Sequence, residues 1–194
     1  PMTSIFSDNV YGHVNIGQYE YNPEKSKELL AEAGYTNGIK LPESFAPNIP
    51  AYTPVNTFMQ EMLRQVGIDL PIQQVDTPAW STALYDDQSA VTLTISLQNP
   101  HGAINLSRSY HSDGQANFTH YNKSDQLIEQ LEQEMNEEEA KRLFSQIQQD
   151  IYDDYVNLPF VYTLQAQAWR NEVDLGYELI DSPIYVTPIY ETTD

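Results

Sequence analysis

The sequence contains no cysteine, few basic residues and no long hydrophobic run. Without cysteine the chain can form no disulfide bond, and it has no thiolate for catalysis or metal binding. Only 9 Lys and Arg residues stand against 28 Asp and Glu residues, which gives a net charge of −19. Because nucleic acids and anionic membranes attract proteins through basic residues, this balance argues against both as partners. No apolar stretch approaches the roughly 20 residues that a transmembrane helix needs.

What remains is the composition of an acidic globular protein. The chain has 194 residues, of which 40% are hydrophobic, so it can bury a core. Residues 1–6 have neither the basic start nor the long apolar stretch of a signal peptide. The first residue is Pro1 and not an initiator Met, so we expect a processed or excised segment of a longer protein. The P-loop, the Rossmann glycine fingerprint and the G-x-S-x-G elbow are all absent from the sequence.

Three predicted helices begin with the same pattern, a capping residue followed by proline. These starts lie at Asn22-Pro23, Thr53-Pro54 and Thr77-Pro78. The first two helices are predicted to end at Gly34 and Gly67, because glycine readily adopts the conformation that terminates a helix.

Alternation of apolar and polar residues predicts strands over residues 68–72 and 91–97, and another strand is predicted over 157–162. Residues 98–121 are rich in turn-forming residues and are predicted to form a long irregular loop. Helices that alternate with strands in this way predict an α/β fold.

A helical hairpin is predicted after this loop. Its first helix carries an apolar stripe made of Leu127, Ile128, Leu131 and Met135. Asn136 is placed to cap the second helix, and Glu139 stands where it would complete a capping box. Because the joint between the two stripes is short, the helices are expected to lie antiparallel.

The predicted loop holds three of the four histidines and follows a strand, where α/β proteins place ligand contacts. His111 could bind nickel, copper or zinc through its neutral imidazole. No spacing typical of a zinc site accompanies it, so an ordinary polar loop residue is the competing interpretation. Two functions of other classes stay open: a metal-dependent hydrolase that uses His101, His111 and Asp113, and an interaction module that binds basic proteins through its acidic face.

Several longer motifs occur in a characteristic order. Residues 5–10 read IFSDNV, and residues 19–35 read YEYNPEKSKELLAEAGY. They are followed by MLRQVGID at 62–69, YNKS at 121–124 and LPFVY at 158–162. In this order they resemble the C-terminal lobe of the family 5 solute-binding proteins, which serve peptide and nickel ABC importers. The resemblance covers nearly the whole chain.

The resemblance implies an α/β lobe of a two-lobed periplasmic-binding-protein fold (type II, Venus-flytrap), with a mixed sheet flanked by helices. Residues 1–170 would form the ligand-binding lobe, and residues 171–194 would form a tail that returns toward the other lobe. The implied function is not enzymatic: the protein would capture a solute between its lobes and deliver it to a membrane permease. Its partners would be the permease subunits and its own N-terminal lobe, which this sequence lacks. Its place would be the periplasm or, as a lipoprotein, the cell surface.

Within the family, the chain resembles the nickel-chelate branch more than the peptide branch. The motifs that carry this are Asn99-Pro100-His101 and the stretch RSYHSD at 108–113. By resemblance, His111 is the metal ligand, and the remaining ligand-binding residues are Asn99, His101, Arg108 and Tyr110. The cargo would be nickel held by a chelator such as histidine, and the protein would have no cofactor of its own. Asp113 or a backbone carbonyl would fix the tautomer of His111 by accepting a hydrogen bond.

The alternative within the family is a receptor for dipeptides or oligopeptides. Peptide-binding members carry an acidic residue in the loop where this chain has Leu97-Gln98-Asn99. The chain also departs from the nickel branch, because Thr94 and Gln98 stand where that branch has Trp and Tyr. The aromatic clamp of that branch is therefore absent or displaced.

Overall fold

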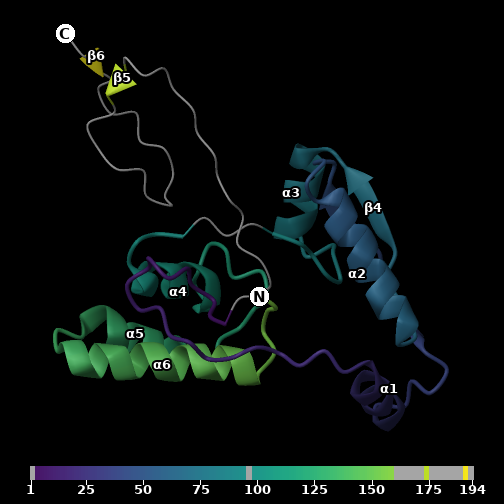
Figure 1. Ribbon diagram of the computed structural model, residues 1–194, viewed down its shortest axis with the longest axis horizontal. Helices are drawn as coiled ribbons and strands as arrows, with labels where there is room; N and C mark the ends of the chain where they lie inside the picture. Colours follow the sequence, from purple (N-terminus) through teal and green to yellow (C-terminus); the bar gives the residue numbers. More distant parts are fainter. Residues whose placement is uncertain (1–2, 95–97, 160–172, 175–189, 192–194) are drawn as a thin grey trace. The chain divides into compact units, whose positions relative to one another are not determined.

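The computed structural model describes residues 3–94, 98–159, 173–174 and 190–191 (Figure 1). The chain divides into two compact units, one formed by Pro1–Gln18 together with Ser96–Asp194 and the other by Tyr19–Ile95. We call these unit 1 and unit 2. Unit 2 is thus an insertion in the sequence of unit 1. In the part of the chain that is described, no helix is long and apolar enough to cross a membrane.

Unit 2 combines short parallel strands with helices. Its helices are α1 (Pro23–Glu32), α2 (Thr53–Gln65) and α3 (Thr77–Tyr85). Its strands are β1 (Ile39–Lys40), β2 (Ser44–Pro47), β3 (Ile68–Asp69) and β4 (Ile72–Val75). Strand β1 pairs with β3 and β2 pairs with β4, both in parallel. Helix α2 makes the crossover that parallel strands require.

The predicted starts of these helices are confirmed to within a residue. Asn22 caps α1, and its Oδ1 accepts a hydrogen bond from the Lys25 amide at 2.9 Å. Thr53 and Thr77 are the first residues of α2 and α3 and not their caps, so those two assignments were one residue late. In α3 the preceding Asp76 is the cap, because its carboxylate accepts from the Ala79 amide at 2.8 Å.

The strand predictions were only partly right. The strand predicted over 68–72 exists as the two short strands β3 and β4. Residues 91–94 and 157–159 form no strand, and the remainders of those two predicted strands lie outside the described residues. The predicted boundary between lobe and tail at residues 170 and 171 also lies outside them, so it stays a prediction.

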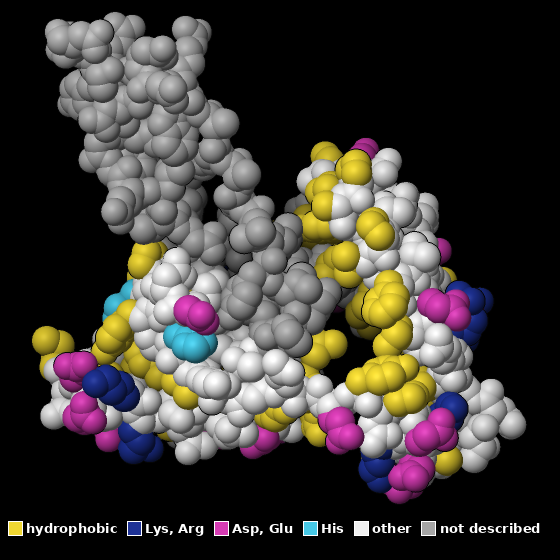
Figure 2. Space-filling model, viewed as in Figure 1, with side chains coloured by type: hydrophobic (Ala, Val, Ile, Leu, Met, Phe, Trp, Pro, Cys, Tyr) yellow, Lys and Arg dark blue, Asp and Glu magenta, His cyan; other side chains and the backbone are white. Residues whose placement is uncertain are grey.

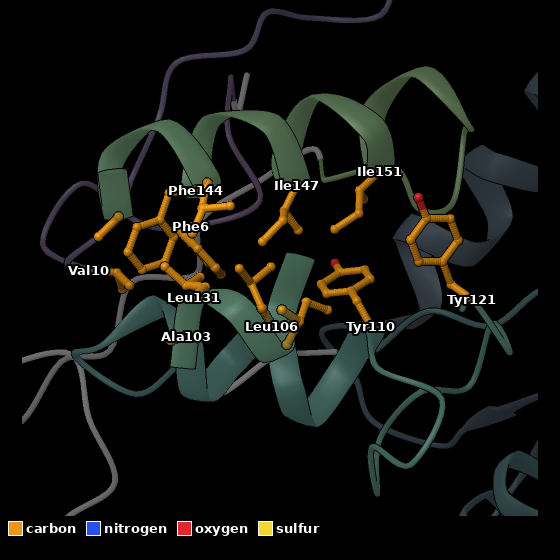
Figure 3. Close-up of a cluster of buried hydrophobic side chains, with 13 residues drawn as sticks. Phe6, Val10, Ala103, Leu106, Tyr110, Tyr121, Leu131, Phe144, Ile147 and Ile151 are labelled. Carbon is orange, nitrogen blue, oxygen red and sulfur yellow. The ribbon is translucent and has the colours of Figure 1, made fainter. Parts of the chain in front are cut away.

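Unit 1 is built on the helices α4 (Gly102–Tyr110), α5 (Asp125–Gln133) and α6 (Glu137–Asp153), with β5 (Val173–Asp174) and β6 (Tyr190–Glu191) as an antiparallel pair. Its core lies between these helices and residues 3–18, which we call the N-terminal segment (Figure 3). The largest fully buried side chains there include Phe6, Leu106, Ile128, Phe144 and Ile147. This core therefore joins Phe6 and Val10 to residues 103–151, which lie on the other side of unit 2 in the sequence.

Helix α4 corrects the prediction of an irregular loop over 98–121. Ala103, Leu106 and Tyr110 are spaced three and four residues apart, and all of them are buried in the core of unit 1. This spacing puts them on one face of a helix. The turn residues on both sides obscured this nine-residue helix in the sequence.

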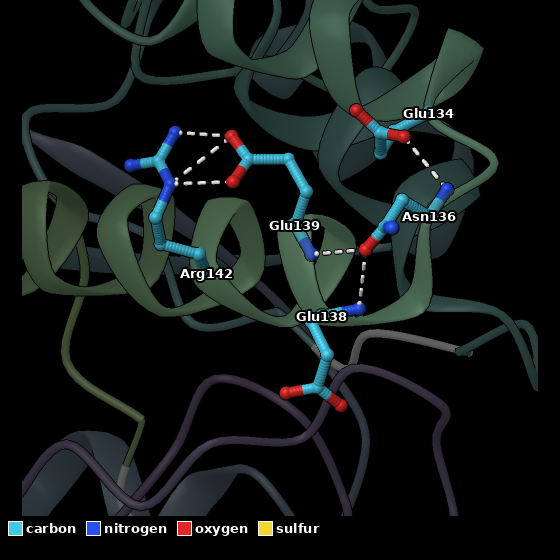
Figure 4. Close-up of polar contacts among 5 residues, drawn as sticks. All are labelled: Glu134, Asn136, Glu138, Glu139 and Arg142. Atoms are coloured by element: carbon cyan, nitrogen blue, oxygen red, sulfur yellow. Dashed lines mark hydrogen bonds and ion pairs between the residues drawn. The ribbon is translucent and has the colours of Figure 1, made fainter.

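The helical hairpin of α5 and α6 is confirmed, with two corrections. Met135 is 95% exposed and belongs to no apolar stripe, because it lies in the joint between the helices. Asn136 caps α6 by accepting from the amides of Glu138 and Glu139 (Figure 4). The predicted capping box is wrong: the Asn136 amide donates to Glu134 at 2.7 Å, while the Glu139 carboxylate pairs with Arg142.

Candidate ligand-contact site

The segment Gln98–His101, which leads into α4, is held in place by side chains on both sides. Gln98 reaches the N-terminal segment: its Oε1 accepts from the Ser7 amide at 2.9 Å, and its Nε2 donates to the Ile5 carbonyl at 2.7 Å. Asn105, in the first turn of α4, is 7% exposed. Its Oδ1 accepts from the Asn99 amide at 2.8 Å, and its Nδ2 donates to the Asn99 carbonyl at 2.9 Å.

An aromatic pair lies at the end of this segment. The Tyr11 amide donates to the Pro100 carbonyl at 2.7 Å, and the Gly102 amide donates to the Tyr11 carbonyl at 2.8 Å. These bonds bring the rings of Tyr11 and His101 to a centroid separation of 4.8 Å. Phe144 of α6 lies edge-on to Tyr11 at 5.6 Å. Tyr11 is 42% exposed, so the pair presents ring surface to solvent.

A side chain at Gly102 would prevent this arrangement. A Cβ atom there would lie 2.7 Å from both the Phe6 ring and the Tyr11 carbonyl oxygen. Such contacts are shorter than packed carbon atoms allow. The segment Gln98–His101 and the chain around Tyr11 can therefore approach each other only because residue 102 is glycine.

The predicted site residues divide into two groups at opposite ends of α4. Asn99 and His101 precede the helix, whereas Arg108, Tyr110 and His111 lie at its C-terminal end. At 1.5 Å per residue, His101 and His111 are separated by about 15 Å along the helix axis. The two histidines therefore do not form one metal site, and the hydrolase built on His101, His111 and Asp113 is not assembled.

Two predicted site residues in the last turn of α4 differ in their surroundings. Tyr110 is 8% exposed and packs in the core, where its hydroxyl is hydrogen-bonded to the Asn157 side chain. Arg108 is exposed to solvent. Within the described ranges, no group of three or more His, Asp or Glu residues could hold a metal ion.

His111 itself packs against α5, and its side chain is only 13% exposed. Its Nδ1 accepts a hydrogen bond from the Asp113 amide at 3.1 Å. This reverses the expected contact, in which Asp113 would be the acceptor. Nε2 is the nitrogen left for a metal ion, and it lies 3.5 Å from the Glu129 carboxylate. A neutral imidazole in this setting carries its proton on Nε2, so metal binding there requires that proton to leave.

A polar network lies between the residues just before α5 and the end of α6. It surrounds a hollow of about 250 Å³ lined by Tyr121, Lys123, Asp150, Asp153 and Asp154. The Lys123 ammonium lies 2.6 Å from the Asp154 carboxylate and holds the pKa of that carboxyl below its usual range. The Tyr121 hydroxyl donates to the same carboxylate at 3.1 Å, and burial raises the pKa of Tyr121. These contacts tie the loop before α5 to the end of α6.

Comparison with known proteins identifies the family. The family model for bacterial extracellular solute-binding proteins, family 5 Middle, matches residues 1–118. The chain belongs to this family. Its solved relatives have the two-lobed periplasmic-binding-protein fold, which confirms the predicted fold class.

One similar structure that covers nearly the whole chain is that of MoaA from A. tumefaciens R10, solved in complex with mannopinic acid. It has a TM-score of 0.83 at 26% identity, over 98% of this chain and 41% of MoaA. NikA of Staphylococcus aureus, solved with Ni(L-His)2, gives a TM-score of 0.71 at 24% identity over 80% of this chain and 35% of NikA. The likeness to NikA at this identity shows the fold alone.

Curated relatives match a shorter part of the chain. A Brucella ovis protein described as an ABC transporter peptide-binding protein is 40% identical over 74 residues, which is 36% of this chain and 14% of that protein. The glutathione-binding protein GsiB of Escherichia coli K12 is 32% identical over 76 residues, 39% of this chain and 15% of GsiB. This family 5 chain therefore spans less than half the length of the relatives it matches.

Tyr11, Gln98 and Asn105 were not predicted as site residues. Tyr11 and Gln98 make contacts between positions that are distant in the sequence. Asn105 lies in α4, a helix that was not predicted. The helical spacing of Ala103, Leu106 and Tyr110 was the available signal, because it would have placed Asn105 in the first turns of a helix directly after Asn99.

Proposed function

We propose that this family 5 chain is part of the solute receptor of an ABC importer, and that its cargo is a peptide or a peptide-like organic solute. The observation that supports this cargo is the segment Gln98–His101, which is held by the Asn105 side chain and includes Asn99 and His101, whose ring lies against that of Tyr11. Amide groups and ring faces suit an organic ligand. His111, in contrast, is packed against Glu129.

The relatives support the same choice of cargo. Proteins named for binding peptides and glutathione match the chain at 40% and 32% identity, and glutathione is itself a peptide. MoaA, which matches nearly the whole chain, was solved with another organic molecule, mannopinic acid. In this proposal the receptor is not an enzyme and works outside the cytoplasm, in the periplasm or as a surface lipoprotein. It binds its solute between two lobes, of which this chain supplies one, and delivers it to the permease.

Calorimetric titration of the full-length protein tests this proposal. Trialanine, glutathione and mannopinic acid are titrated separately, and we expect at least one of them to bind. The isolated chain serves as the control and should bind the same probe far more weakly, because it lacks the contacts of the other lobe. Absence of binding by all three probes to the full-length protein would refute an organic cargo of this kind.

A nickel chelate is the second candidate, and the position of His111 favours it. Its Nε2 lies 3.5 Å from the Glu129 carboxylate, and the Glu129 side chain is 62% exposed. Titration with nickel and excess histidine, in the unsubstituted protein and in His111→Ala, tests this. Nickel-dependent binding that disappears in His111→Ala would support the chelate, whereas binding that persists in the variant would exclude His111 as the ligand.

A further inference from the structure

We infer that Asn105 is a positioning residue. It holds the backbone of the Gln98–His101 segment in the conformation that presents the side-chain amide of Asn99 and the Tyr11–His101 ring pair to the ligand. The inference rests on the proposed function and names the part of the ligand that this surface recognises. It concerns a residue that touches no solute itself, because its side chain is 7% exposed and both of its polar atoms are bound to the Asn99 backbone.

The contacts of Asn105 leave the Asn99 backbone no freedom to rotate. Its amide and its carbonyl are both bound by the same buried side chain, at 2.8 Å and 2.9 Å. Turning either peptide unit would leave a polar group of Asn105 buried without a partner, which is unfavourable. On the two sides of Asn99, Gln98 and Pro100 are bound to the N-terminal segment. Asn99 is therefore fixed from three directions.

The side chain of Asn99 is left available by these contacts. Its amide forms no hydrogen bond with the residues that the structure describes. Fixing a backbone before binding removes an ordering cost that the ligand would otherwise have to offset. A half-buried amide on a fixed backbone is therefore better suited to bind a ligand than the same amide on a mobile loop.

The chemistry of this surface indicates which part of the ligand it takes. The five residues from Gln98 to Gly102 include no Asp, Glu, Lys or Arg. An Asn side chain both donates and accepts, as an amide bond does, so the two can pair through two hydrogen bonds. The rings of Tyr11 and His101, at the end of the same segment, offer a surface on which a flat amide group packs. The segment therefore recognises the amide-bearing middle of a peptide-like ligand and not its charged ends.

Titration of Asn105→Ala in the full-length protein tests this inference, with the tighter-binding of the two amide-containing probes, trialanine and glutathione. We expect about a tenfold loss of affinity, which corresponds to the ordering cost of roughly one backbone residue. Asn136→Ala is the matched control, because it also removes two hydrogen bonds between an Asn side chain and backbone: at the remote start of α6 the Asn136 Oδ1 accepts from the Glu138 and Glu139 amides. It should change the affinity by less than about twofold.

Two further measurements separate positioning from general destabilisation. The Asn99 backbone amide should exchange its hydrogen faster in Asn105→Ala than in the unsubstituted protein. The affinity losses of Asn99→Ala and Asn105→Ala should not multiply in the double variant, because Asn105 acts partly through Asn99. If Asn105→Ala does not fold, Asn105→Asp replaces it, since its carboxylate keeps an acceptor for the Asn99 amide.

The outcomes distinguish this inference from the proposed function. If the unsubstituted protein binds a probe and Asn105→Ala binds it equally well, or Asn136→Ala loses as much, the inference is wrong and the proposed function stands. If no probe binds, the proposed function fails. The exchange measurement then decides the positioning role alone, and an Asn99 amide that exchanges equally fast in both proteins would overturn it.

Discussion

Replacing Gln148 of α6 should destabilise unit 1 more than any comparable polar substitution on this helix. The Gln148 side chain is fully buried. It accepts from the Ser4 hydroxyl at 3.1 Å and donates to the Gly12 carbonyl at 2.7 Å. Leu at this position would leave the buried Ser4 hydroxyl and the half-buried Gly12 carbonyl without that partner, at about 1–3 kcal/mol each. Part of this is offset by the burial of an apolar side chain, so we expect Gln148→Leu to lower the free energy of unfolding by about 3 kcal/mol.

The same helix offers a matched control. Gln146 points to solvent and makes one exposed hydrogen bond, to Asp150 at 2.7 Å, so Gln146→Leu should cost less than about 0.5 kcal/mol. Both variants are unfolded in urea and followed by far-UV circular dichroism, and the hydrogen exchange of α6 amides reports on unit 1 separately. Adding Ser4→Ala to Gln148→Leu should recover part of the loss, because both partners are then apolar. Equal losses for the two leucine variants would refute the reasoning.

Two further predictions follow from backbone and charge. Gly12 and Gly34 both have positive φ, at +94° and +90°, but a Cβ atom on Gly12 would lie 2.4 Å from the Phe144 ring while one on Gly34 meets nothing within 4 Å. Gly34→Ala should therefore lower the free energy of unfolding by only roughly 1–2 kcal/mol, which is the cost of a side chain on a left-handed backbone, and Gly12→Ala should lower it clearly more. Thermal unfolding of the two variants measures this, and equal losses would contradict the packing argument. Because the Lys123 ammonium lowers the folded-state pKa of Asp154, this pair stabilises the fold above the pKa of the unfolded carboxyl and loses its effect as the pH falls through the folded pKa. Asp154→Asn should remove that part of the dependence of the free energy of unfolding on pH. Urea unfolding at several pH values measures it, and a free energy that falls as steeply with acid in the variant as in the unsubstituted protein would disprove the prediction.

The helices of this protein were predictable where their signals are local. The cap at Asn22 and the apolar stripe of α5 act within one or two turns; the cap is confirmed, and so is the stripe apart from Met135. Helix α4 was missed because it is short and lies between turn residues, although its buried residues have helical spacing. Met135 was misassigned because an apolar residue in a joint has the same spacing as one on the stripe.

The candidate site was less predictable, since its geometry depends on contacts between distant positions. Gln98 binds Ile5 across 93 residues of sequence, and no periodic pattern carries such information. The division of the predicted site residues between the two ends of α4 likewise depended on recognising that helix. The family resemblance gave the fold class and the order of elements, but it could not show that His111 packs against Glu129.

The packing of Phe6 and Val10 against helices that lie beyond unit 2 in the sequence has a consequence for synthesis on the ribosome. Ser4 meets its partner Gln148 only after 144 further residues have been made, whereas unit 2 has all its residues between positions 19 and 95. At about 5–20 residues per second, Phe6 and Val10 wait on the order of 10 s for the helix that buries them. Unit 2 can fold during that interval. Phe6 and Val10 stay without the partners that bury them until α6 emerges and completes unit 1.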